Sequence, residues 1–208
     1  MANIFKYFWK AFFVFLLFVC SHNIVNAQSN FKTPLFAEKG FIVGYGNGID
    51  SLNIPEGKYT VVYLMAHLGI DIFRNSQINQ NRLGKTFVIF EPQLNPVFIK
   101  SSGKTLNALE FGVNVGVQHL YPLLKDKIYT YIQISAGPHF MSAHTTRQAR
   151  GFLFSDNLST GMYLRINQSL IVNLSFRLRH LSNADTRSPN QGINTFNYHI
   201  GFSKLLIK

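Results

Sequence analysis

Cysteine is almost missing from this chain of 208 residues, which contains only Cys20. A disulfide needs two cysteines, and redox or zinc sites usually need clusters of them. Cys20 also lies inside an apolar stretch close to the N-terminus, where an export signal would stand. The sequence therefore predicts a domain that is stable without disulfides and a function without cysteine chemistry.

An export signal is predicted at the N-terminus. Two lysines give it a basic start, and the apolar run 11–20 that follows is too short to cross a bilayer as a helix. Small residues at 25–27 match the spacing of a cleavage site. We predict a signal peptide over residues 1–27 and a single mature domain over residues 28–208.

Long apolar runs are missing from the rest of the chain. After residue 27, no stretch reaches the roughly 18 uninterrupted apolar residues that a transmembrane helix requires. Hydrocarbon cannot satisfy free backbone N–H and C=O groups. A chain of this kind can therefore span a membrane only as a closed β-barrel.

Acidic residues are also few. Removing the predicted signal takes away two lysines, so 18 of the 20 Lys and Arg residues remain against all 9 Asp and Glu, a net charge of +9. A basic surface favours anionic partners. Because an exported protein does not meet nucleic acid, we predict anionic lipid as the partner, either phospholipid or lipopolysaccharide.

What the sequence does contain is a two-residue alternation of apolar and polar side chains, clearest over 109–118, 170–179 and 196–203. Such alternation predicts strands with one apolar and one polar face. The polar faces mix glycines with charged and amide side chains, as a narrow barrel interior requires. Tyrosines near the predicted strand ends suit the interfacial girdles of a membrane barrel; they are Tyr45, Tyr59, Tyr121, Tyr129, Tyr131 and Tyr163.

The fold class that we predict is all-β: an eight-stranded antiparallel transmembrane β-barrel after an N-terminal signal peptide. Eight is an even number, as bacterial barrels require. The predicted strands cover residues 40–47, 59–72, 85–99, 106–118, 128–140, 151–165, 169–180 and 194–206. With both termini in the periplasm, the loops near 48–58, 100–105, 141–150 and 181–193 face the outside of the cell.

A histidine and a serine near the C-terminus are the candidate catalytic pair. His180 and Ser182 are two residues apart, so on an extended strand they share a face, which could place a base beside a hydroxyl nucleophile. They also share their parity with the apolar positions of 170–178, which face lipid in a membrane barrel. The same pair could instead be two polar side chains at the wet membrane interface.

The segment RHLSNADTRSPNQGIN, residues 179–194, resembles the signature of the lipid A 3-O-deacylase (PagL) family, also described as acyloxyacyl hydrolases of the outer membrane. Weaker similarity lies upstream, over 137–139, 145–149 and 151–156. The resemblance covers the C-terminal third well and the rest of the chain by architecture alone. It implies an eight-stranded barrel in the outer membrane, with the 181–193 loop on the extracellular side, that removes an ester-linked acyl chain from lipid A.

The resemblance also implies roles for single residues. His180 matches the general base of the family, Ser182 its nucleophile, and Asn190 a residue implicated in the oxyanion hole. It implies no metal and no cofactor, and the partners are lipid A or lipopolysaccharide and the surrounding outer-membrane lipid. Nothing in the sequence selects a monomer or an oligomer.

The chain departs from the family at the catalytic acid. The family's glutamate falls on Asn194, whose amide can orient an imidazole but cannot stabilise an imidazolium by charge. Asp156 is a possible substitute. If the turn between the sixth and seventh strands centres on residue 167, Asp156 lies diagonally from His180 on the same face, within reach of a side-chain bond or a bridging water. We therefore hypothesise that Asp156, Asn194 or both orient His180.

The remaining histidines of the mature chain lack the spacing of metal ligands and are predicted to be lumen or loop residues. They are His67, His119, His139, His144 and His199.

Three functions remain open from the sequence. The first is an outer-membrane esterase that acts on lipid A. The second is a structural or interaction barrel with weak or no activity, which the asparagine at position 194 favours. The third is a soluble periplasmic barrel whose apolar faces line a lipid-binding cavity.

Overall fold

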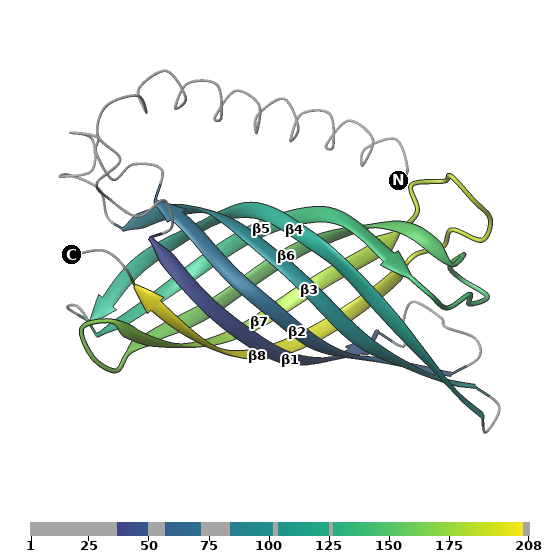
Figure 1. The fold of residues 1–208 in the computed structure, drawn as a ribbon, viewed down its shortest axis with the longest axis horizontal. Helices are drawn as coiled ribbons and strands as arrows, with labels where there is room; N and C mark the ends of the chain where they lie inside the picture. The colour runs from purple at the N-terminus through teal and green to yellow at the C-terminus, as the bar shows by residue number, and fades with distance from the viewer. Residues whose placement is uncertain (1–36, 50–56, 72–83, 102–103, 125–126, 206–208) are drawn as a thin grey trace, which may run out of the picture. The chain divides into compact units, whose positions relative to one another are not determined.

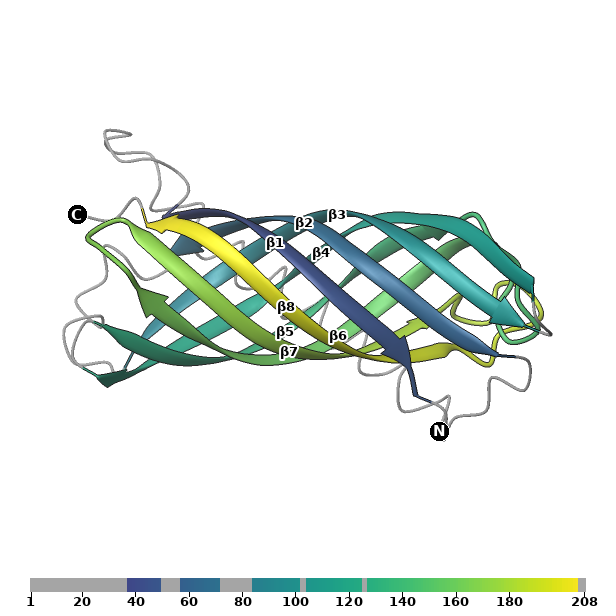
Figure 2. The same cartoon turned by 90° about the horizontal axis from the view of Figure 1, so that it is seen from below.

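The computed structural model describes residues 37–49, 57–71, 84–101, 104–124 and 127–205. They form eight antiparallel strands in one closed sheet (Figure 1). The strands are β1 (Glu38–Gly48), β2 (Lys58–Asp71), β3 (Lys85–Ser101), β4 (Lys104–Leu124), β5 (Ile128–Met141), β6 (Gly151–Arg165), β7 (Leu170–Ser182) and β8 (Ile193–Leu205). Each strand pairs with the next, and β1 pairs with β8 to close the barrel (Figure 2).

The predicted fold class is confirmed, and seven of the predicted strands end within two residues of the observed ones. The exception is β4, which was predicted to end at residue 118 and continues to Leu124. Its register against β5 shifts between Pro122 and Leu124. Proline has no N–H for the ladder, so it is tolerated at such an irregular strand end. The predicted signal peptide, 1–27, lies outside the described residues, and in the described part no helix is long and apolar enough to cross a membrane.

The two faces of the sheet differ as the alternation predicted. Outward positions carry large apolar side chains, for example Phe111, which is 50% exposed, and Phe202, which is 54% exposed. Inward positions are buried and many are polar. This arrangement contradicts the third hypothesis, a soluble barrel with an apolar lipid-binding cavity, because the apolar faces point away from the lumen.

The predicted tyrosine girdle is only partly correct. Tyr45 and Tyr121 lie on the outer surface, about half exposed. Tyr59, Tyr131 and Tyr163 are buried in the lumen, because they occupy the inward positions of their strands. Residue type and closeness to a strand end suggested the girdle, but the side of the sheet is decided by parity.

The lumen is filled in three zones. An apolar cluster lies toward the end that carries the 142–150 and 183–192 loops, and includes Leu153, Leu181 and Ile193. A second apolar cluster lies toward the opposite end and includes Phe87 and Ile171. Between them lies a network of charged and amide side chains. The interior is therefore a packed core, as in other narrow barrels, and supports the outer surface from within.

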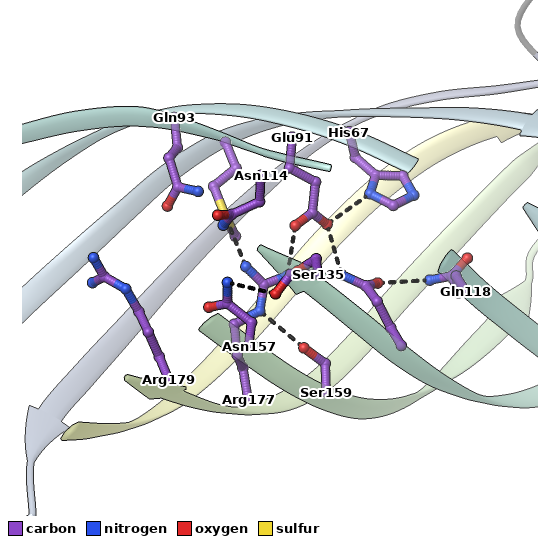
Figure 3. A network of polar contacts seen from close by, with 12 residues as sticks. His67, Glu91, Gln93, Asn114, Gln118, Ser135, Asn157, Ser159, Arg177 and Arg179 are labelled. Atoms are coloured by element: carbon purple, nitrogen blue, oxygen red, sulfur yellow. Dashed lines mark hydrogen bonds and ion pairs between the residues drawn. The ribbon is translucent and has the colours of Figure 1, made fainter. Parts of the chain in front are cut away.

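Two buried ion pairs organise the polar zone, and both arginines come from β7. Arg177 donates to Glu91 over 2.8 Å, and Glu91 also contacts Nδ1 of His67 at 3.0 Å and accepts from Gln133 (Figure 3). Arg179 pairs with Glu110. A buried charge is stable only when it is paired, so these arginines and glutamates must stay in contact. Because the glutamates belong to β3 and β4, the ion pairs hold β7 to the opposite wall of the barrel.

Glu110 gathers a second set of contacts beside Arg179. Nδ1 of His139 lies 2.8 Å from Oε1 of Glu110, and Nδ2 of Asn95 donates to the same oxygen over 2.9 Å. Arg179 donates in addition to the hydroxyl of Tyr63 over 3.0 Å. β7 is therefore anchored from its inward face immediately before residue 180.

Candidate active site

His180 and Ser182 lie on the outward face of β7, at the end of the strand, and both are half-buried. The residue between them, Leu181, points into the lumen, where it is 1% exposed and packs in the apolar cluster with Ile193. Arg179 is bound to Glu110 one position earlier. The inward residues thus fix the backbone from which the imidazole and the hydroxyl project toward the surroundings of the barrel.

Three polar residues form a row across β6, β7 and β8. Asp156 is the direct cross-strand partner of His180 on one side, and Asn194 is its partner on the other. Nδ1 of His180 lies 2.8 Å from Oδ1 of Asn194, so the ring donates to the amide oxygen there. Its basic lone pair then lies on Nε2, the nitrogen that a general base would use.

The diagonal placement predicted for Asp156 is wrong by two residues. The β6–β7 turn is centred one residue later than expected, since Arg165 pairs with Ile171. Oδ1 of Asn167 accepts from the backbone N–H groups of Ser169 and Leu170, which stabilises the four-residue connection 166–169. Asp156 is consequently closer to His180 than the sequence implied.

Asn190 lies in the loop after Ser182 and binds back to that segment. Its Oδ1 accepts from the backbone N–H of Asn183 over 2.8 Å, and its Nδ2 donates to Oδ1 of Asp185 over 2.9 Å. The side chain of Asn183 is buried and donates to the carbonyl of Arg187 over 2.7 Å. Hydrogen bonds made by the side chains of Asn183 and Asn190 therefore hold the loop that follows Ser182.

Backbone conformation in this loop is unusual. Ala184 has a φ of 53° and Asp185 a φ of 62°, in the left-handed region that residues with a Cβ rarely adopt. Such residues need surrounding contacts to hold them, and they often occur at functional sites. Here the bonds made by Asn183 and Asn190 supply those contacts.

Gly192 brings the returning loop against the imidazole. Its φ is 73°, and a Cβ added there would lie 2.4 Å from Cε1 and 3.1 Å from Nε2 of His180. The space for a side chain is therefore occupied by the ring itself. Only glycine combines this backbone angle with such a close approach.

The β5–β6 loop supports this segment from the other side. Ala149 N–H donates to the carbonyl of Pro189 over 2.9 Å, and Gln191 N–H donates to the carbonyl of Arg147 over 2.8 Å. The Arg147 side chain also donates to the 191–192 backbone: Nε reaches the Gly192 carbonyl over 3.2 Å and Nη2 the Gln191 carbonyl over 3.4 Å. The two loops that flank the candidate site are thus joined by backbone and side-chain bonds.

An apolar surface continues from the polar row along the outside of the barrel. Leu178 and its cross-strand partners Leu158 and Phe196 follow next on the outward face. Phe196 stacks against Phe176 with ring centroids 5.5 Å apart, and Tyr198 lies beside them. The imidazole and the hydroxyl therefore lie at the border of an apolar outer surface.

The arrangement contains the groups for acyl transfer: a hydroxyl, an imidazole on the same strand face, and an amide that orients the ring. Among the described residues, no group of three or more His, Cys, Asp or Glu is placed to hold a metal ion. Two participants, Arg147 and Gly192, lie inside the segments that resemble the family, but nothing in the sequence predicted the contact between them. Their contacts join segments about 45 residues apart, which no local pattern reveals.

Comparison with known proteins identifies a family that matches this chain. The model of the family described as lipid A 3-O-deacylase (PagL) matches residues 97–203, which is about half of the chain. A search of curated proteins gave no match.

Two solved structures share the fold. The crystal structure of the outer membrane enzyme PagL is 16% identical, with a TM-score of 0.52, and the match covers 79% of this chain and 98% of that one. Neisserial surface protein A is 9% identical, with a TM-score of 0.53, and the match covers 82% and 96% of the two chains. At these identities the likeness establishes the architecture only. The family match over the half of the chain that holds His180, Ser182 and Asn194 shows that this protein belongs to the lipid A 3-O-deacylase (PagL) family.

Proposed function

We propose that this protein is an outer-membrane esterase that removes an ester-linked acyl chain from lipid A, with Ser182 as nucleophile and His180 as general base. The observation that carries the proposal is the outward position of both side chains, with Nδ1 of His180 bound to Asn194 at 2.8 Å. An outward site is accessible to a substrate that is itself a membrane lipid. Family membership supplies the class of substrate.

The proposed reaction is acyl transfer to water. Nε2 of His180 takes the proton of the Ser182 hydroxyl as its oxygen attacks the ester carbonyl, and the ring then protonates the leaving sugar oxygen. Water, activated in the same way, releases the fatty acid from Ser182. Asn194 contributes by keeping the ring in the orientation that points Nε2 toward the nucleophile.

Asn190 is the proposed donor to the oxyanion. Its Nδ2 donates to Asp185 in the structure, so it would exchange that carboxylate for the substrate oxygen as negative charge develops there. A donor of this kind contributes about 10²- to 10³-fold to the rate. The loop that carries it begins directly after Ser182, which favours a short reach.

The acyl chain of the substrate is proposed to lie along the outward surface around Leu178 and Phe196. In this arrangement the 183–192 loop faces the extracellular side, where the lipid A head group resides. The fatty acyl chain then passes from the ester toward the middle of the bilayer without leaving an apolar environment.

Asp156 and Asn194 are proposed to orient His180 together, because they are its two direct cross-strand neighbours. Purified Asp156→Asn, Asn194→Ala protein should release fatty acid from lipid A at about one hundredth of the parent rate, since misplacement of a catalytic group by about 1 Å has that effect. A double variant that works as fast as its parent would remove both residues from the proposal.

The experiment that tests the function compares lipid A from three bacterial strains by mass spectrometry: one expressing the parent, one expressing Ser182→Ala and one carrying an empty vector. We expect loss of one acyl group only with the parent. Identical acylation in all three strains would instead support the second candidate, a barrel without catalysis. The specific observation behind that candidate is the amide at position 194, where the family has an acid.

A further inference from the structure

Besides its cross-strand neighbour Asp156, the imidazole of His180 has two contacts of different kinds. One is the hydrogen bond from Nδ1 to Asn194, and the other is the close approach of Gly192, which leaves no room for a Cβ beside Cε1 and Nε2. A hydrogen bond to a neutral amide is weaker than one to a carboxylate. The packing of Gly192 against the ring is therefore a second constraint on the orientation of the imidazole, beside the bond to Asn194.

Arg147 of the β5–β6 loop contacts the backbone of Gly192 directly. Arg147 accepts from Gln191 N–H through its own carbonyl, at 2.8 Å, and its guanidinium donates to the carbonyls of Gly192 and Gln191. The planar guanidinium can reach both carbonyls at once, which an ammonium group cannot do in the same way. Three hydrogen bonds therefore connect Arg147 to Gly192, which packs on the imidazole, and to its neighbour Gln191.

The β5–β6 loop is itself suited to hold an arginine in place. Thr145 Oγ1 accepts from Gln148 N–H over 2.8 Å, and Thr145 N–H donates to the Gln148 carbonyl over 2.9 Å, which closes a tight turn around residues 145–148. Gln148 is fully buried and forms a bridge with Asn190. Arg147 therefore projects from an ordered turn that is docked on the active-site loop.

We propose that Arg147 is a positioning residue for deacylation: it holds the Gly192 backbone against His180 and so keeps the imidazole directed at Ser182. The inference rests on the proposed function. It adds that a residue of a different loop, β5–β6, helps to orient the imidazole of His180. It assigns to Arg147 a structural contact with the base through Gly192, and not a contact with the substrate.

The obvious competing role for an arginine in this loop is attraction of the anionic lipid. Arg150 provides the matched control, since it lies three residues away in the same loop, is exposed and carries the same charge. Loss of either arginine removes one positive charge from the loop. Only replacement of the Arg147 side chain removes the two guanidinium bonds to the 191–192 backbone.

The experiment measures covalent labelling of Ser182 by a small uncharged fluorophosphonate, using the purified full chain folded in detergent. This probe reports the activation of the serine and needs no lipid phosphate. We expect Arg147→Ala to be labelled about 10- to 100-fold more slowly than the parent, as a displaced base predicts, and Arg150→Ala to be labelled at the parent rate. With lipid A as substrate, Arg147→Ala should lower kcat and leave KM close to the parent value.

A second variant covers the case in which Arg147→Ala does not fold, as judged by heat-modifiable mobility on gels. Arg147→Lys keeps the charge but not the paired donors, and we expect a rate of labelling between those of Arg147→Ala and the parent. Labelling of folded Arg147→Ala or Arg147→Lys at the parent rate would overturn the inference, as would an equal loss in Arg150→Ala. If the parent is labelled no faster than Ser182→Ala, the proposed function fails as well, so the two failures can be told apart.

Discussion

The two faces of β7 use polar residues in opposite ways. Inside the barrel, Arg177 and Arg179 are almost fully buried and each is bound to a glutamate and to further side chains. Outside, His180 and Ser182 are half-buried, and Nδ1 of His180 is bound to the neutral amide of Asn194. The inward groups stabilise the fold, whereas the outward groups are the ones that we propose to react. Strand alternation places both sets within six residues of one another.

The comparison predicts that the largest change in stability comes from the inward face. Arg177→Met should lower the free energy of unfolding by about 3–5 kcal/mol, because it leaves Glu91 buried without its arginine. Urea unfolding in detergent, followed by gel mobility, measures the change. The double variant Arg177→Met, Glu91→Leu should recover much of the loss. A loss below about 1 kcal/mol in the single variant would show that the inward network does not anchor β7.

Gly192→Ala changes the outward face. We expect it to lower the free energy of unfolding less than Arg177→Met does, but to lower activity more. The added Cβ would collide with the imidazole of His180, so the rate of fatty-acid release should fall about 100-fold. The left-handed backbone at this position should lower stability by about 1–2 kcal/mol.

Gly151→Ala separates these two effects. Gly151 also has a positive φ, of 108°, but a Cβ there would approach Arg187 at 3.3 Å and not the imidazole. It should therefore lose stability and keep most of its activity. If both alanine variants lose the same fraction of activity, contact with the ring is not the cause.

How far the sequence predicts this molecule depends on the range of the interactions involved. Alternation is local, so it correctly predicted eight strands and put His180 and Ser182 on the outward face. Register depends on turn geometry, and the side-chain bonds of Asn167 in the β6–β7 turn moved Asp156 by two positions from its expected partner.

The support of the base lay beyond sequence reasoning for the same reason. Gly192 and Arg147 come from loops on different hairpins, and their link depends on how the closed barrel brings those loops together. The motif Pro-Asn-Gln-Gly showed that a glycine was present. It did not show that the imidazole of His180 occupies the space of the missing side chain.

The smallest expected effect comes from Asn194→Asp, which compares a neutral with a charged partner of His180. Asn194→Asp preserves the shape of the side chain and its acceptor oxygen, but adds the charge that the inward face already uses. The rate of fatty-acid release should rise about tenfold, because a carboxylate stabilises the imidazolium that forms during the reaction. Initial rates at saturating lipid A measure it, with Asn194→Ala as the control that should fall below the parent. A slower Asn194→Asp protein would show that the amide is required as such.

The most direct measurement is the initial rate of fatty-acid release from lipid A by purified parent, Ser182→Ala and His180→Ala proteins in the same detergent. We predict that both variants remain folded and that each is slower than the parent by about 10³-fold or more, since either loss removes one half of the nucleophile and base pair. Release by either folded variant at the parent rate would contradict the assignment of catalysis to the outward face of β7.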